Sequence, residues 1–171
     1  MLTVYPLERS RGILRFEDRE YPCALGCNDV RSTKREGDGA TPVGIFSLRQ
    51  VFYRSDRLPP PTSGLPVRAL APNDGWCDDP GHRDYNRFVR LPFEASHEAL
   101  WREDNLYDVI VVVGHNDDPP HPGLGSAIFI HCTTKDFAPT QGCVALARET
   151  LVELLPWLAP DIALHIMEAQ G

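Results

Sequence analysis

The residues best suited to chemistry are a histidine and a cysteine in the stretch 128–146. His131 ends an apolar run, and Cys143 follows it after a polar loop that contains one proline. A thiol becomes an effective nucleophile when a neighbouring imidazole takes its proton. We therefore expect Cys143 to be the nucleophile. We expect His131 to be the general base, which later returns the proton to the leaving amine.

The residues on either side of the cysteine suit the same chemistry. A glycine, Gly142, precedes it and lets the backbone lie close to the sulfur. In that position the amides of Gly142, Cys143 and Val144 could donate to a developing oxyanion. These three amides are the predicted oxyanion hole.

The two residues after His131 bear on its role. A backbone carbonyl, of either Cys132 or Thr133, could orient the imidazole ring. Cys132 is also the rival thiol of this stretch. Side chains alternate along a strand, so Cys132 is expected to point to the opposite face from His131.

The elements that must position these residues are mostly strands. Short apolar segments predict strands over 2–5, 12–16, 21–26, 44–53, 108–114, 127–131 and 162–168. Helices are predicted over 96–102 and 148–158, the second with leucines at helical spacing and a proline beyond its end. The expected fold class is therefore mainly β with one or two helices. The chain on either side of the 132–142 loop is expected to pair as antiparallel segments.

The stretch 58–92 differs from the rest in composition. It opens with three prolines and is long for a structureless connection. Trp76 and Tyr85 argue against disorder, and they either line a cleft or anchor the segment. We expect a single domain over 1–171 with an ordered insertion at 58–92.

Composition excludes several classes of function. The chain has 171 residues, is 42% hydrophobic and carries a formal net charge of −7, which does not suit a nucleic-acid binder. The most apolar run, 109–113, has the length of a strand, so no membrane segment is expected. No leader pattern is seen at the first residues, which favours the cytoplasm, or the periplasm if a leader is missing from this sequence or export is non-classical.

The five cysteines follow no disulfide-scaffold pattern and are expected to be free thiols. Cys23 and Cys27 resemble half of a zinc site, but no second pair follows, so buried apolar roles are the better interpretation. We expect no metal and no cofactor.

Two separated motifs together resemble the L,D-transpeptidase catalytic domain, also called the YkuD domain. The first is His131 followed by Thr140-Gln141-Gly142-Cys143-Val144. The second lies upstream and reads Gly37-Asp38-Gly39-Ala40-Thr41-Pro42-Val43-Gly44-Ile45-Phe46. They occur in the family's order, and the resemblance covers roughly residues 20–150.

The resemblance implies a β-sandwich-like domain with the cysteine in a cleft. Enzymes of this family attack peptidoglycan stem tetrapeptides between meso-diaminopimelate and the terminal D-alanine. An acyl-enzyme forms on the cysteine, D-alanine leaves, and an amine then takes the acyl group. The implied partner is a peptidoglycan stem peptide or muropeptide, with Thr140 and Gln141 among the substrate-binding residues. The oligomeric state is not predicted.

The sequence departs from the family pattern at two positions. Gln141 stands where the family usually has a histidine, and Ala145 where it usually has an arginine or asparagine. His115 could supply the missing polar function, or it could cap a turn after a buried strand. Arginines that could bind substrate carboxylates are Arg54, Arg57, Arg83 and Arg87.

Several alternatives remain open from the sequence. With water as acceptor, the same residues would make a cytoplasmic L,D-carboxypeptidase that trims recycled tetrapeptides. The replacement at Gln141 suggests a non-catalytic module that binds cell-wall peptides. A redox sensor would use Cys132 and Cys143. Finally, a buried cysteine and a strand histidine are often purely structural.

Overall fold

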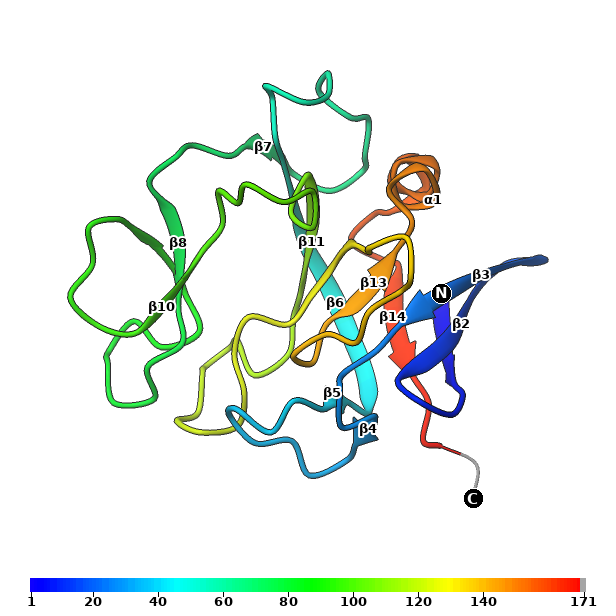
Figure 1. Cartoon of the computed structure of the whole chain (residues 1–171), viewed down its shortest axis with the longest axis horizontal. Helices are drawn as coiled ribbons and strands as arrows, with labels where there is room; N and C mark the ends of the chain where they lie inside the picture. Colours follow the sequence, from blue (N-terminus) through cyan, green and yellow to red (C-terminus); the bar gives the residue numbers. More distant parts are fainter. Residues whose placement is uncertain (170–171) are drawn as a thin grey trace.

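The computed structural model describes residues 1–169, and nearly all of its regular elements are strands. The elements in chain order are β1 (Leu2–Pro6), β2 (Arg11–Phe16), β3 (Arg19–Ala24), β4 (Val30–Arg31), β5 (Thr41–Pro42), β6 (Gly44–Tyr53), β7 (Val67–Ala69), β8 (Asp74–Cys77), β9 (Phe88–Arg90), β10 (His97–Ala99), β11 (Val109–Val113), β12 (Phe129–Cys132), β13 (Val144–Leu146), α1 (Arg148–Leu154), a 3₁₀ turn (Leu155–Trp157) and β14 (Ala163–Ile166). Figure 1 shows their arrangement.

The largest sheet closes on itself. Its strand order is β11-β12-β13-β3-β2-β1-β14-β6-β7, and β11 also pairs with β6. That extra pairing joins the two sides of the sheet into a barrel-like ring, with β7 attached outside it. Closure leaves few unpaired strand edges, which are a liability in open sheets.

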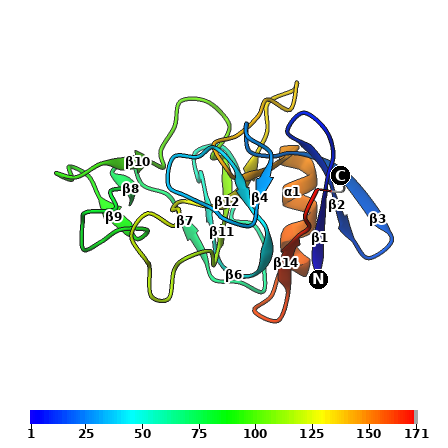
Figure 2. The same cartoon turned by 90° about the horizontal axis from the view of Figure 1, so that it is seen from below.

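The interior of the ring is filled by aliphatic side chains and sealed by the helix. Leu151 and Leu154 of α1, together with Leu155 and Leu158 beyond it, are buried in the same core as the strands. Figure 2 shows α1 lying beside β14 and β1, in the right half of the view. The leucine spacing that predicted the helix over 148–158 is therefore explained by packing against the barrel core.

A second, smaller core lies outside the ring. The sheet β10-β8-β9 packs there, and alternation along β11 divides its side chains between the two cores. Val109, Val111 and Val113 belong to the barrel core, whereas Ile110 and Val112 belong to the outer one. This explains why residues 109–113 of β11 are apolar at every position rather than at every second one.

The predicted strands are all present, with ends shifted by a few residues. One of the predicted helices is wrong: 96–102 holds strand β10, which pairs antiparallel with β8. The pairing of the chain on either side of the 132–142 loop was also wrong, because β12 and β13 are parallel. The separate sheet takes in β10 as well as β8 and β9, and so extends beyond the insertion expected at 58–92.

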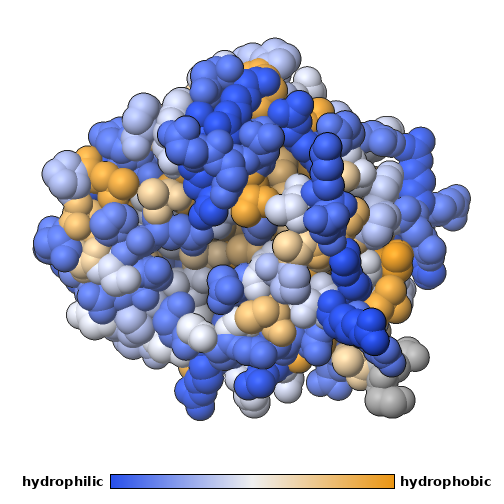
Figure 3. All heavy atoms as spheres, in the orientation of Figure 1, coloured by the Kyte–Doolittle hydropathy of each residue, from blue (hydrophilic) through white to orange (hydrophobic). Residues whose placement is uncertain are grey.

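The surface is mostly hydrophilic on the face shown in Figure 3, where a hollow with an apolar floor opens near the centre. Within residues 1–169, no helix is long and apolar enough to cross a membrane.

Candidate active site

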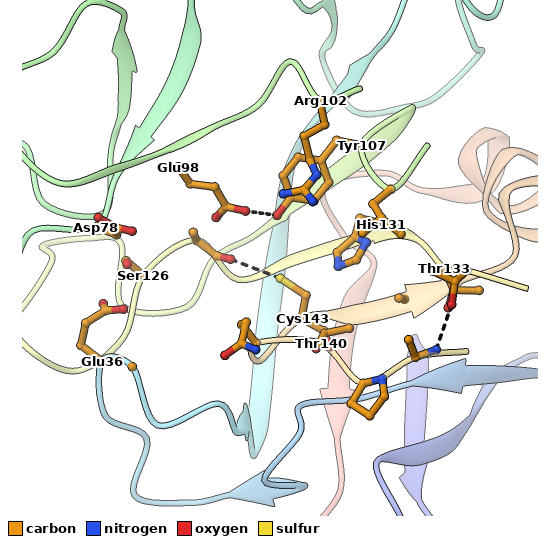
Figure 4. Close-up of a pocket in the computed structure, with 18 of the residues that line it drawn as sticks. Glu36, Asp78, Glu98, Arg102, Tyr107, Ser126, His131, Thr133, Thr140 and Cys143 are labelled. Carbon is orange, nitrogen blue, oxygen red and sulfur yellow. Dashed lines mark hydrogen bonds between the residues drawn. The ribbon is translucent and has the colours of Figure 1, made fainter. Parts of the chain in front are cut away.

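Parallel pairing of β12 with β13 brings His131 and Cys143 to one cavity. In the register of the two strands, Ile130 is opposite Val144 and His131 is opposite Ala145. Side chains two residues apart share a face, so Cys143 falls on the same face as Ala145 and His131. All three line a cavity of about 480 Å³. Figure 4 shows the imidazole and the thiol side by side in it.

The Cys143 thiol is held by two backbone groups rather than by the imidazole. Its Sγ donates to the carbonyl oxygen of Ala127 at 3.3 Å and accepts from the amide of Phe129 at 3.4 Å. Burial raises the pKa of the thiol to about 12. A catalytic cysteine is often recognised by a lowered pKa, and this one has the opposite shift in the resting structure.

The tautomer of His131 follows from its hydrogen bond. Its Nδ1 lies 2.7 Å from the carbonyl oxygen of Cys132. A carbonyl oxygen only accepts, so Nδ1 carries the proton and Nε2 keeps a free lone pair. Of the two carbonyls expected to orient the ring, the Cys132 carbonyl is the one that does so. Burial lowers the pKa of His131 to about 4, which keeps the ring neutral.

The two sequence motifs meet around the cysteine. Thr41, from the upstream motif, accepts from the amide of Gly26 at 2.8 Å and donates to the carbonyl of Cys143 at 3.5 Å. Gly142 has φ +128°, and a Cβ there would lie 2.8 Å from the carbonyl oxygen of Ala40. The glycine is therefore required by the close approach of the Gly37–Thr41 turn, as well as by its own backbone conformation.

Thr140 fixes the turn that presents the thiol. Its Oγ1 donates to the Cys143 carbonyl at 2.7 Å and accepts from the Gly142 amide at 3.1 Å. Its backbone is held between Leu25 and Cys27 by two hydrogen bonds of 2.8 Å. Thr140 and the exposed Gln141 both line the cavity, where the sequence placed them.

The three amides of the predicted oxyanion hole are not equivalent. The Gly142 amide already donates to Thr140 within the turn, as described above. Val144 lies in β13, which pairs with β12 and β3. The amide of Cys143 lies between the Gly142 amide, which is already hydrogen-bonded, and the paired strand β13. Their joint role in binding an oxyanion stays a prediction.

Three residues expected to contact substrate lie outside the cavity lining. His115 places Nε2 2.9 Å from the carbonyl of Leu124 and packs edge-on against Phe46, which is a structural role in a turn. The indole of Trp76 packs against Phe129 in the outer core. The Tyr85 hydroxyl bonds to Glu36. These three assignments are corrected, because each side chain is used to anchor the loops around the cavity.

None of the four arginines proposed for substrate carboxylates lines the cavity either. Arg54 is buried against Trp101 and pairs with Asp56, and Arg57 pairs with the buried Asp108. Arg83 is exposed beside Asp84, and Arg87 lies at a different hollow. The arginine in the cavity wall is Arg102, which the sequence did not single out.

Sequence reasoning also missed the acidic part of the cavity. Glu36, Asp78 and Glu98 line it, as do Ser126 and Tyr107. Tyr107 donates its hydroxyl to Glu98 and packs edge-to-face on His131, with ring centres 5.2 Å apart. Glu98 was hidden in the segment wrongly predicted to be helical, and no local spacing connected any of these residues to Cys143.

The remaining cysteines do not form a second site. Cys23, Cys77 and Cys132 are buried, and burial raises the pKa of each, whereas Cys27 is exposed, contrary to the expected buried role. Cys132 belongs to the barrel core and Cys143 to the outer one, which argues against a disulfide between them. Among residues 1–169, no cluster of His, Cys, Asp and Glu could hold a metal ion.

Comparison with protein families gives a match over nearly the whole chain. The sequence model of the L,D-transpeptidase catalytic domain (YkuD) matches residues 7–165. Neither the comparison with curated proteins nor the one with solved structures gave a significant match.

Proposed function

Because the chain belongs to the L,D-transpeptidase catalytic domain family, we propose that it is a cysteine acyltransferase that acts on peptidoglycan stem peptides. Members of this family are cysteine-dependent L,D-transpeptidases that act on peptidoglycan peptides. In the proposed reaction, Cys143 is acylated with release of D-alanine, and an amine accepts the acyl group.

The observation that carries the proposal is the shared cavity of Cys143 and His131. Both line it from adjacent strands, inside the segment that matches the family. The Nδ1–H bond to the Cys132 carbonyl leaves the Nε2 lone pair of His131 available as a base. A cavity of about 480 Å³ has the size usual for small-ligand sites.

Acylation starts from two neutral groups. The thiol rotates away from the Ala127 carbonyl, and its proton passes to Nε2 of His131 as the sulfur attacks the peptide carbonyl carbon. A C–S bond forms and the carbonyl oxygen becomes an oxyanion. The C–N bond then breaks, and the proton on Nε2 moves to the departing D-alanine amine. A thioester on Cys143 remains.

Transfer to the acceptor reverses these steps. A neutral amine attacks the thioester carbon and gives its proton to Nε2 of His131. The C–S bond breaks, the sulfur recovers the proton, and a new amide leaves the cavity. If water takes the place of the amine, the product is a free carboxylate and the enzyme is an L,D-carboxypeptidase.

The test is a product analysis by mass spectrometry with a disaccharide-tetrapeptide, with and without an added D-amino acid. We expect loss of D-alanine, a thioester adduct on Cys143, and incorporation of the D-amino acid. Cys143→Ala should abolish all three, whereas Cys27→Ala, at the exposed cysteine, should leave them unchanged.

Each other outcome has a definite meaning. Loss of D-alanine to water alone would identify a carboxypeptidase and overturn the amine acceptor. Absence of any product and of any adduct, with retained peptide binding, would identify a binding module and overturn the enzymatic proposal.

A further inference from the structure

A chain of hydrogen bonds leads from Asn86, in the turn between β8 and β9, to the Cys143 thiol. The side-chain oxygen of Asn86 accepts from the amide of Ala127 at 3.0 Å. The carbonyl oxygen of Ala127 in turn accepts from Cys143 Sγ at 3.3 Å, which is the dashed line that ends at the sulfur in Figure 4. Asn86 therefore holds one of the two backbone groups that contact the thiol, although Asn86 itself does not line the cavity.

The Asn86 side chain makes every hydrogen bond that an amide can make. Its oxygen also accepts from the indole Nε1 of Trp76 at 2.9 Å. Its nitrogen donates to the carbonyls of His115 and Asn116 at 3.0 and 2.7 Å. Two N–H groups thus face the oxygen and two carbonyls face the nitrogen, which fixes the orientation of the amide. The residue is 5% exposed, and an aspartate or threonine in its place could not satisfy all four groups.

Both residues joined by this hydrogen bond have a left-handed backbone. Asn86 has φ +54° and Ala127 has φ +52°. Asparagine adopts this conformation more readily than most residues, whereas alanine adopts it at a cost. A strained residue persists only where its surroundings determine its conformation, and such residues are concentrated at functional sites. On the amide side of Ala127, the contact that determines the conformation is the Asn86 side chain.

The backbone of Asn86 is anchored in the outer sheet rather than in the segment that its side chain holds. Its amide donates to the carbonyl of Cys77 at 2.9 Å, and the amide of Cys77 donates to the carbonyl of Arg87 at 2.9 Å. Strand β8 pairs with both β9 and β10. The three-stranded sheet is therefore the support from which Asn86 reaches the segment before β12.

We propose that Asn86 is a positioning residue for the proposed nucleophile Cys143, and that it acts by holding Ala127 in its left-handed conformation. The inference rests on the proposed function for its kinetic consequence, and it gives the outer sheet a part in that reaction. With Ala127 held, its carbonyl and the amide of Phe129 keep the sulfur in the cavity that it shares with His131. The thiol proton then has only to turn from the carbonyl toward Nε2 of His131 for the attack to begin.

Loss of the Asn86 side chain should release this arrangement. Ala127 is then expected to relax toward an ordinary backbone conformation, which turns its carbonyl away from Cys143. The sulfur keeps the Phe129 amide but becomes free to adopt other rotamers. A misplacement of about 1 Å costs up to about 10²-fold in rate, and the loss falls on kcat because substrate binding is not changed.

The main test compares Asn86→Gly with the unmodified protein. Glycine tolerates the left-handed backbone and removes the whole side chain. We expect kcat for release of D-alanine to fall by about 10²-fold with little change in KM. The Cys143 S–H stretch, isolated by infrared difference against the same protein with Cys143→Ala, should shift from its frequency in the unmodified protein. An unchanged kcat or an unchanged S–H stretch would overturn the proposal.

Asn116→Gly is the matched control. Asn116 has φ +49°, and its side chain organises the neighbouring turn through hydrogen bonds to His121 and Gly125. Its replacement should lower stability but leave kcat, KM and the S–H stretch unchanged, which separates positioning of the thiol from a general loosening of the loops. Equal shifts of the S–H stretch in the two variants would contradict the role of Asn86.

Measurements on the unmodified protein decide the question if Asn86→Gly does not fold. Hydrogen exchange followed by NMR should show the Ala127 amide protected as strongly as the amides of β12, and the Cys143 S–H stretch should be that of a hydrogen-bonded thiol. A rapidly exchanging Ala127 amide, or a free S–H stretch, would overturn the proposal. Failure of the proposed function is recognised separately, as the absence of an acyl adduct on Cys143, while infrared and exchange still report whether Asn86 positions the thiol.

Discussion

At the scale of single residues, the proposed catalytic pair rests as a neutral thiol beside a neutral imidazole. Burial raises the pKa of Cys143 to about 12 and lowers that of His131 to about 4. A preformed thiolate–imidazolium pair would need both shifts reversed. In the proposed reaction the proton therefore moves as the sulfur attacks.

Thiol alkylation tests this resting state. We expect the rate of iodoacetamide labelling at Cys143 to keep rising with pH beyond about 9, because the raised pKa keeps the thiolate fraction small until strongly alkaline pH. Peptide-resolved mass spectrometry over about pH 6 to 10 measures it, and the exposed Cys27 serves as the internal reference. A midpoint below that of an ordinary thiol would instead show an ion pair.

The base role of His131 has its own kinetic signature. His131→Gln can keep a hydrogen bond to the Cys132 carbonyl but has no basic nitrogen. We expect kcat to fall by about 10²–10⁴-fold with a small change in KM, as is typical when a general base is removed. Steady-state release of D-alanine measures both constants. His121→Gln, at an exposed position, should behave as the unmodified protein, and a KM effect alone in His131→Gln would contradict the assignment.

At the scale of elements, the site is made by the loop from β12 to β13. Parallel pairing requires this loop to cross over, and Thr140 fixes its end by bonding to both Gly142 and Cys143. The upstream Gly37–Thr41 turn closes against it. Cys143 is thus positioned by contacts between two motifs that are distant in the sequence.

Replacement of Thr140 should separate shape from hydrogen bonding. Thr140→Val has nearly the same shape but leaves the Gly142 amide without its partner. We expect a loss of about 1–3 kcal/mol in the free energy of unfolding, because a buried donor is left unpaired. Urea denaturation measures the loss, with Thr140→Ser as the control that retains the hydroxyl. Equal stability of the two variants would show that the hydroxyl does not hold the turn.

The sequence predicted where the helix and the barrel strands lie better than it predicted which strands pair and in which direction. Alternating and apolar runs identified the barrel strands, and leucine spacing identified α1. The short strands β8 and β10 were missed because their residues are mostly polar or small, and pairing rather than propensity makes them strands. The parallel direction of β13 could not be read from a segment of three residues.

The residues of the candidate site likewise fall into those that the sequence predicted and those that it could not predict. His131, Cys143, Thr140 and Gln141 lie in one local motif, and the structure places them at one cavity. Asp78, Glu98 and Ser126 reach that cavity only through tertiary packing, so no spacing rule links them to the motif. His115, Trp76 and Tyr85 were singled out by residue type, but their polar atoms are engaged by neighbouring loops.

At the scale of the whole molecule, the buried His131 makes stability depend on pH. Its pKa is about 4 in the folded protein and near 6.5 unfolded. The unfolded chain therefore binds the proton more readily, and the contribution of His131 to stability is fully present above about pH 6.5 and is lost as pH falls toward 4.

The size of this effect is measured by a variant. Between pH of about 7 and 4, we expect the unmodified protein to lose up to about 3 kcal/mol more unfolding free energy than His131→Gln does. Urea denaturation at several pH values gives the difference between the two proteins, which removes the contribution of carboxyl groups common to both. Parallel pH curves would show that the imidazole is solvated in the folded state.

The barrel and the three-stranded sheet share the core that contains Cys143. A change that weakens the contact between them should therefore also expose the Cys143 thiol to alkylating reagents. Trp76 lies at that contact, packed edge-to-face on Phe129 with ring centres 5.2 Å apart. We expect Trp76→Ala to cost about 3–5 kcal/mol of unfolding free energy, because it opens a cavity in a buried cluster. We also expect faster alkylation of Cys143.

Trp157→Ala is the matched control for this change, since Trp157 is 61% exposed beyond α1. Its effect should stay within about 0.5 kcal/mol, with no change in the alkylation rate. Urea denaturation and labelling at neutral pH give both quantities for each variant. If Trp76→Ala lowered stability without exposing Cys143, the outer sheet would be a stabilising addition rather than a wall of the cavity.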